Sequence, residues 1–123
     1  AAACAALDVI VEENLLDHAI KIGEHARKVL KEMSEKYEII GDVRGKGMLI
    51  GVEFVKNRKT KEPATDEALK LKMEAKKRGV FLPTTYGWFG NVMRLHPPLV
   101  ITEKQINRGL EVLEECLKIV SKK

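Results

Sequence analysis

The residue in this sequence best suited to chemistry is Arg94, within the segment NVMRL at 91–95. This segment predicts a short strand, which ends at two prolines because proline cannot donate a hydrogen bond to a sheet. In a strand, Arg94 points to the face opposite Met93 and Leu95. If those two side chains face the helices, the guanidinium projects from an uncovered face, where its fork geometry suits a carboxylate. An ion pair with a nearby glutamate, or simple solvation, is the alternative.

Other motifs that usually carry chemistry are missing from the sequence. It contains no GxSxG, no HExxH and no complete phosphate-binding loop. The segment 45–47 (GKG) resembles part of such a loop, but it precedes a predicted strand and indicates a tight turn with positive φ at glycine. Arg44, directly before it, is expected to pair with a carboxylate and to stabilise this turn.

The cysteines and histidines do not predict a metal site. Cys4 and Cys116 are the two cysteines, and no CxxC occurs. His18 and His25 are seven residues apart, two helical turns, which is too far for two ligands of one metal. Two unpaired cysteines suit a reducing compartment, so a cytoplasmic location is predicted.

Length and composition indicate one globular domain. The chain has 123 residues, of which 45% are hydrophobic and 33% charged. No apolar run reaches the roughly 20 residues that span a bilayer, so no membrane partner is expected. The net charge is +4, but acidic and basic residues alternate along most segments, and aromatic residues make up only 5%. This pattern is typical of solvated helix faces and argues against a nucleic-acid partner.

The helices that must support Arg94 are predicted from apolar periodicity and capping residues. An Ala-rich helix is expected over 1–13, and a second one follows Asn14 as its cap. A third helix is expected to start at the cap Thr65 and to stop at Gly79. The last helix is expected to begin with a capping box, in which Thr102 and Gln105 are the partners.

Strands are predicted from alternating apolar residues between glycines. We expect one strand over 48–55, preceded by a short strand or tight turn at 42–45, and a second over 80–82. The segments 56–63 and 83–90 are expected to be loops. Together with the strand at 91–95, the order of these helices and strands along the chain predicts an α+β fold. Its helices are expected on one face of a small, mostly antiparallel sheet. The other face then lacks a cover within this chain.

Three segments in order carry a family resemblance: ACAALDVIVEENLLDHAIKIGEHARKVL, IIGDVRGKGMLIGVEFV and GNVMRLHPPLVITEKQINRGLEVLEE. With them, residues 1–120 resemble the C-terminal small domain of class III aminotransferases, pyridoxal-phosphate enzymes of the aspartate aminotransferase fold (fold type I). The pattern GNV-x-R at 90–94 is similar to that of 4-aminobutyrate aminotransferase-like proteins.

The resemblance implies a role for each part of the chain. Arg94 would bind the carboxylate of an amino acid or 2-oxo acid, and residues 1–13 would form the helix between domains. In this family the Schiff-base lysine and the cofactor-binding residues lie in a large domain upstream. The resemblance therefore implies no catalytic, cofactor-binding or metal-binding residue in residues 1–123, a large pyridoxal-phosphate-binding domain as partner, a homodimeric parent enzyme, and an inactive isolated chain.

Alternatives remain at this stage. A racemase of the same family would share the carboxylate site. A non-catalytic α+β binding or dimerisation domain would use the open face of the sheet, and a nucleic-acid binder ranks last. The two large aromatic residues just before Gly90, Trp88 and Phe89, either line a substrate entrance or pack on the partner domain.

Overall fold

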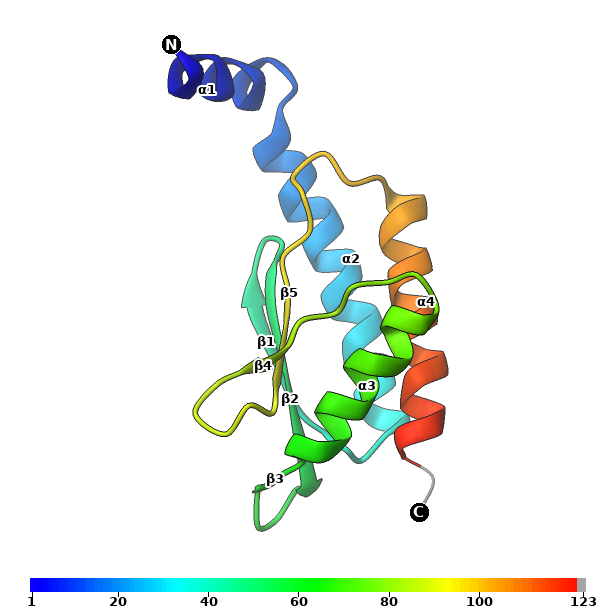
Figure 1. The fold of residues 1–123 in the computed structure, drawn as a ribbon. Coiled ribbons are helices and arrows are strands. Elements are labelled where there is room, and N and C mark those ends of the chain that lie inside the picture. Colours follow the sequence, from blue (N-terminus) through cyan, green and yellow to red (C-terminus); the bar gives the residue numbers. More distant parts are fainter. Residues whose placement is uncertain (122–123) are drawn as a thin grey trace.

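The fold, seen in a computed structural model that describes residues 1–121, combines four helices with a small sheet (Figure 1). The helices are α1 (Ala2–Glu12), α2 (Leu15–Lys36), α3 (Thr65–Lys77) and α4 (Glu103–Val120). The strands are β1 (Ile40–Lys46), β2 (Leu49–Asn57), β3 (Glu62–Pro63), β4 (Thr84–Tyr86) and β5 (Val92–Leu95).

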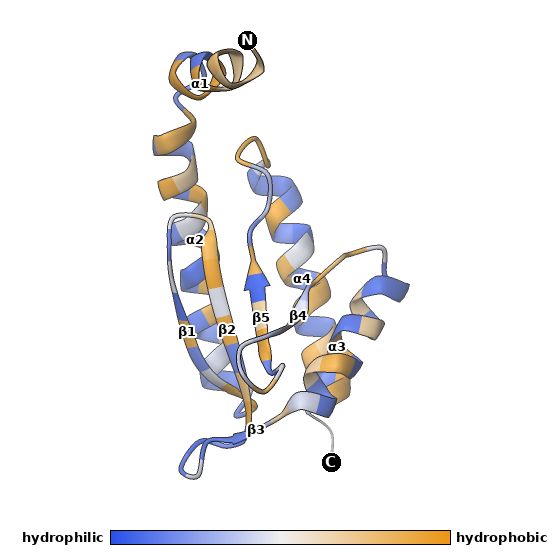
Figure 2. Cartoon of the chain, turned by 60° about the vertical axis from the view of Figure 1, so that its left-hand side comes forward, coloured by the Kyte–Doolittle hydropathy of each residue, from blue (hydrophilic) through white to orange (hydrophobic). Residues whose placement is uncertain are grey.

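The sheet is antiparallel at every described pairing, in the spatial order β1-β2-β5-β4, and β3 pairs with β2. Helices α2, α3 and α4 lie on one side of it, and no described helix covers the other side (Figures 1 and 2). The predicted α+β class and its one-sided helical cover are therefore confirmed.

The core forms where alternating strand residues meet the apolar stripes of the helices. On β2, Ile50, Val52 and Phe54 are buried toward the helices. The helices contribute Leu30 of α2 and Leu71 of α3, both fully buried, and apolar residues of α4. Burying each such side chain contributes about 1.5–3 kcal/mol, so the contact between sheet and helices stabilises the fold strongly.

The turn between β1 and β2 rests directly on α2. A Cβ on Gly23 would lie 2.0 Å from the carbonyl oxygen of Gly47, so only glycine permits this approach. Arg27 of α2 donates from Nη1 to the same oxygen at 3.0 Å. Both Gly45 and Gly47 have positive φ, which confirms the predicted tight turn.

Most predicted helix ends are confirmed; Asn14 occupies the cap position of α2 without a side-chain capping bond, and the cap of α3 is Ala64 and not Thr65. Thr102 and Gln105 form the expected capping box, and Gly79 ends the α3 segment with φ +76°. Asn14 precedes α2 in a left-handed conformation, and its side chain donates to the carboxylate of Asp17 instead of capping the backbone. Thr65 is the first residue of α3, and its hydroxyl does not cap the helix because it donates to the carbonyl of Phe89 in the neighbouring loop.

One strand prediction and one loop prediction require correction. Residues 80–82 do not form a strand, because the amide of Val80 bonds back to Ala75 at the end of α3. The strand lies at β4, inside the predicted loop 83–90, where Thr84 is fully buried and its hydroxyl donates to the carbonyl of Ala68. The strand was predicted at the apolar segment 80–82. It lies instead at a polar segment, because a hydrogen bond to α3 compensates the cost of burying the hydroxyl of Thr84.

The segments flanking the predicted strand over 48–55 are also more ordered than expected. The expected strand or turn at 42–45 belongs to the full strand β1. The predicted loop 56–63 contains the two-residue strand β3, which folds back onto the end of β2.

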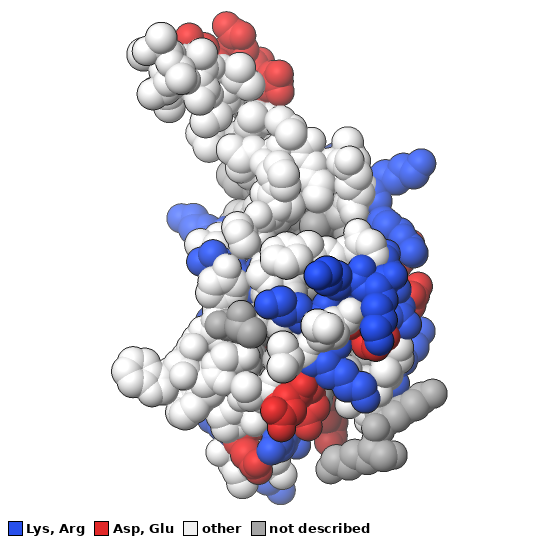
Figure 3. Space-filling view, viewed as in Figure 1, with Lys and Arg blue, Asp and Glu red and all other residues white. Residues whose placement is uncertain are grey.

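Helix α1 stands apart from the packed layers (Figure 1) and contributes no buried residue. Leu7 and Val11 of α1, Leu16 and Ile20 of α2, and Val100 are exposed. In Figure 3 the visible surface around α1 and the start of α2 is largely uncharged, apart from acidic residues at one end. None of the helices described is long and apolar enough to cross a membrane.

Candidate carboxylate-binding site

Strand β5 places Arg94 on the open face of the sheet. Met93 is fully buried and Leu95 is 9% exposed, and both pack toward the helices. Arg94, with the opposite parity, pairs across to Gly51 of β2 and is half-buried. The predicted orientation of Arg94 is confirmed, whereas its ligand remains a prediction.

The Arg94 guanidinium is held by an aromatic residue and not by an acid. Its Nη2 donates to the hydroxyl of Tyr86 at 3.0 Å, and its Cζ lies 4.0 Å from the centre of the Tyr86 ring. Its Nε is buried without a hydrogen-bond partner. Among the described residues, no aspartate or glutamate forms an ion pair with Arg94. The internal ion pair considered as an alternative is therefore not formed within this part of the chain.

Arg44, on the same face of the sheet, has the opposite surroundings. Its Nη1 donates to Asp42 at 2.7 Å and to Glu53 at 2.8 Å. These hydrogen bonds, first that to Asp42 and then that to Glu53, raise the pKa of Arg44 above its usual value. The expectation that Arg44 pairs with a carboxylate in the turn region is confirmed.

Gly51 separates the two arginines in the middle of β2. Its direct neighbours are Arg44 on β1 and Arg94 on β5. A Cβ at Gly51 would meet nothing closer than 3.8 Å, so the packing of this chain does not require glycine there. A glycine inside a strand often marks a place where a ligand or another backbone approaches closely.

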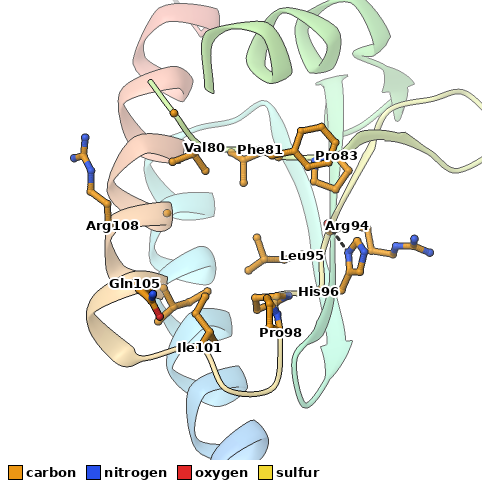
Figure 4. Close-up of a pocket in the computed structure, with 15 residues that line it drawn as sticks. Val80, Phe81, Pro83, Arg94, Leu95, His96, Pro98, Ile101, Gln105 and Arg108 are labelled. Carbon is orange, nitrogen blue, oxygen red and sulfur yellow. Dashed lines mark hydrogen bonds between the residues drawn. The ribbon is translucent and has the colours of Figure 1, made fainter. Parts of the chain in front are cut away.

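A separate cleft of about 430 Å³ lies on the other side of β5, between the segments 79–83 and 94–98 and the start of α4. Figure 4 shows the Arg94 guanidinium pointing away from this cleft, while Leu95 points toward it. His96 is exposed beside it, with Nδ1 3.4 Å from the carbonyl oxygen of Arg94. The cleft is mainly apolar and does not include the charged group of Arg94.

The aromatic loop after β4 is mostly exposed. Trp88 is 95% exposed and Phe89 is 60% exposed, whereas Tyr86 touches Arg94. The sequence indicated an aromatic loop near Arg94, but it did not indicate that Tyr86 would be the contact. The two readings of Trp88 and Phe89, substrate entrance or packing on a partner domain, both stay predictions.

A pyridoxal-phosphate site needs a lysine amine for the Schiff base and a charged group at the pyridine nitrogen. The cleft beside β5 is lined by no lysine, aspartate or glutamate. Each described lysine is exposed except Lys72 of α3, which is half-buried and does not line that cleft. The cleft beside β5 therefore does not fit this cofactor.

The fold matches solved structures of known enzymes. A Bacillus anthracis aminotransferase superposes with a TM-score of 0.87 and 30% identity, over 95% of this chain and 27% of that one.

Two relatives of different activity are similar in sequence. The alanine/serine racemase of Pyrococcus horikoshii is 48% identical over 118 residues, which are 96% of this chain and 24% of the racemase. The mitochondrial alanine–glyoxylate aminotransferase 2 homolog 2 of Arabidopsis thaliana is 42% identical, over 92% of this chain and 24% of that protein.

The chain thus spans about a quarter of the length of these relatives. The family model for class-III aminotransferases matches residues 1–117. That match, together with the shared fold, shows that this chain belongs to the class-III aminotransferase family, whose members depend on pyridoxal phosphate.

Proposed function

We propose that this chain provides the substrate-carboxylate site of a pyridoxal-phosphate enzyme that transfers an amino group between an amino acid and a 2-oxo acid. The observation that carries the proposal is Arg94. It is a guanidinium on an uncovered sheet face, and no acid among the described residues neutralises it.

The contribution of this chain is binding and orientation. A guanidinium can donate two parallel hydrogen bonds to a carboxylate, which specifies direction as well as charge. A substrate held in this way has lost much of its rotational freedom before reaction, and this lowers the barrier. The cofactor supplies the electron sink of such enzymes. We propose that it is held by a large domain of the same protein.

Exposed apolar surface supports such a partner domain. Leu7 and Val11 of α1, Leu16 of α2 and Trp88 are exposed large apolar residues that would normally be covered. We propose that the rest of the enzyme covers this surface and the open sheet face, with residues 1–13 as the connecting helix. A homodimeric enzyme is part of the same proposal.

A racemase is the second candidate, because the Pyrococcus horikoshii alanine/serine racemase has the higher identity of the two relatives, 48% against 42%. Both reactions would use the same carboxylate site. Incubating the enzyme with L-alanine alone distinguishes them, since D-alanine forms without a 2-oxo acid only if the enzyme is a racemase. With a 2-oxo acid, 4-aminobutyrate or a similar amino acid is the first donor to test.

The deciding experiment is Arg94→Ala in the enzyme that contains this chain. Losing one partner of a buried charged pair costs roughly 2–4 kcal/mol, so kcat/KM for carboxylate substrates should fall by about 30- to 800-fold. Arg108→Ala is the matched control, because Arg108 pairs with Glu111 on the exposed surface of α4. Unchanged kinetics for Arg94→Ala would mean that Arg94 is structural.

The isolated chain gives a second test. We expect the purified 123-residue chain to show no transamination, because the cleft beside β5 has no lysine and the family resemblance assigns the Schiff-base lysine to a large domain. Detectable turnover would contradict this. If the chain acted instead as a dimerisation domain, it would associate in a concentration-dependent way and would show no carboxylate binding that depends on Arg94.

A further inference from the structure

Tyr86 holds the Arg94 guanidinium, and we infer that Tyr86 is a positioning residue for carboxylate binding at this arginine. The inference rests on the proposed function, since it assigns a role inside the same site. It depends on three features: the path of β4, the two contacts of Tyr86, and the donors that Arg94 keeps free.

The path of β4 brings Tyr86 to the face of Arg94. Thr84 pairs with Met93, and both side chains are buried toward the helices. In a regular strand Tyr86 would point to the same side as Thr84, because strand side chains alternate. A register shift between Thr84 and Tyr86 instead pairs Tyr86 with Val92, on the face of Arg94. Such bulges redirect side chains and are frequent beside functional sites.

Two contacts of Tyr86 then restrain the guanidinium. The Cζ of Arg94 lies over the Tyr86 ring, 4.0 Å from the ring centre, and the hydroxyl accepts from Nη2 at 3.0 Å. The ring restricts the tilt of the planar group, and the hydroxyl restricts its rotation. The backbone is held as well, because the amide of Arg94 donates to the carbonyl of Pro83 at 3.0 Å.

The remaining donors define where a carboxylate can bind. Nε is buried, so that edge of the guanidinium is closed to a ligand. Nη2 has a second N–H besides the one given to Tyr86, and Nη1 has no protein partner among the described residues. Nη1 and Nη2 border the outer edge of the guanidinium, and we place the carboxylate there.

Restraint of this kind favours binding. A free arginine side chain loses rotamer entropy when it is fixed by a ligand, and preorganisation removes this cost from the binding step. Tyr86 therefore increases the affinity for a carboxylate without contacting the reacting atoms.

The test uses the holoenzyme that contains this chain and the half-reaction with L-alanine, which yields an apparent Kd and a limiting rate. Tyr86→Leu removes both contacts and should raise the apparent Kd about tenfold, the sum of a hydrogen bond and a cation–π contact. Tyr86→Phe keeps the ring and should raise it about threefold. The limiting rate should stay within about twofold in both variants, because Tyr86 strengthens binding of the substrate and of the transition state equally.

Arg94→Leu and the double variant Arg94→Leu/Tyr86→Leu complete a cycle. If Tyr86 acts through Arg94, the second substitution adds no further loss in the Arg94→Leu background. Tyr37→Phe is the matched control, because it removes a tyrosine hydroxyl bonded to Glu114 on the helical side. Its apparent Kd should be that of the unmodified enzyme.

The outcomes separate the two proposals. An unchanged apparent Kd in Arg94→Leu overturns the proposed function and this inference together. If affinity falls in Arg94→Leu but in neither Tyr86 variant, the inference alone is overturned. The same holds if the two substitutions have additive effects on the apparent Kd of the double variant. Tyr86→Phe keeps the test valid if Tyr86→Leu does not fold.

Discussion

Arg44 and Arg94 share one face of one sheet, yet their surroundings differ. Arg44, in the β1–β2 hairpin, donates to two carboxylates at 2.7 and 2.8 Å. Arg94, in the β4–β5 hairpin, stacks on Tyr86 and has no acid partner among the residues described. An arginine neutralised by its own chain stabilises the fold, whereas one oriented by an aromatic ring keeps its charge available for a ligand. If the proposed function is correct, the β1–β2 hairpin is structural and the β4–β5 hairpin carries the binding residue.

The largest effect is expected where the β1–β2 hairpin rests on α2. Gly23→Ala would place a Cβ 2.0 Å from the carbonyl oxygen of Gly47. Because the Cβ is fixed directly to the backbone of α2 and the oxygen belongs to the backbone of the hairpin, neither atom can turn away, and we expect a loss of about 3 kcal/mol in the free energy of unfolding, measured by urea denaturation. Gly109→Ala on α4 is the control, since a Cβ there meets no atom within 4 Å. Equal stability of the two variants would contradict the close packing of the hairpin on α2.

Gly51→Asp would make the surroundings of Arg94 resemble those of Arg44. The new carboxylate would lie on the strand position directly opposite Arg94, where a Cβ has room. An internal charge-assisted pair contributes about 1.5–3 kcal/mol, so KM for carboxylate substrates should rise roughly 10- to 100-fold. Gly51→Asn is the neutral control of the same size and should have a much smaller effect. Equal effects of both substitutions would indicate steric blocking instead of charge pairing.

Arg44→Ala tests the other side of the comparison. The Arg44 side chain is more than half exposed, and exposed ion pairs contribute about 0–1 kcal/mol to stability. We therefore expect the free energy of unfolding to fall by about 1 kcal/mol, because Asp42 and Glu53 would be left close together without a cation. KM for the substrate should not change. A KM effect as large as that of Arg94→Ala would show that both arginines bind the ligand.

The smallest effect is expected for Glu74 of α3. Its carboxylate forms ion pairs with Lys77 and Arg78. Like the acids around Arg44, it is an acid paired within the chain. The hydrogen bonds from Lys77 and Arg78 lower the pKa of Glu74 from 4.5 to about 2. Its stabilising contribution is therefore complete above pH 4.5 and is lost as the pH falls toward 2. In thermal melts, the difference between the unmodified chain and Glu74→Gln should shrink across this interval. A constant difference would mean that Glu74 acts by packing.

Local signals in the sequence were enough to predict much of the fold. The apolar stripes of α2 and α4, the capping box at Thr102 and the stop at Gly79 depend on residues within a few positions of each other. The prediction for Thr84 failed because a distant group is involved: this polar residue is buried, and its hydroxyl donates to the carbonyl of Ala68 on α3. The prediction for 80–82 failed for a local reason, since the amide of Val80 bonds to Ala75 at the end of α3.

For the site, the sequence by itself determined that Arg94 would leave the core side of its strand, because alternation follows from backbone geometry and the neighbours Met93 and Leu95 are apolar. Only the tertiary structure decided what Arg94 meets there. The bulge in β4 redirects Tyr86 to this arginine, and the registers of β1, β2 and β5 align Arg44, Gly51 and Arg94 across three strands. Strand register and bulges depend on pairing between segments far apart in the chain, and residue types along one segment do not specify that pairing.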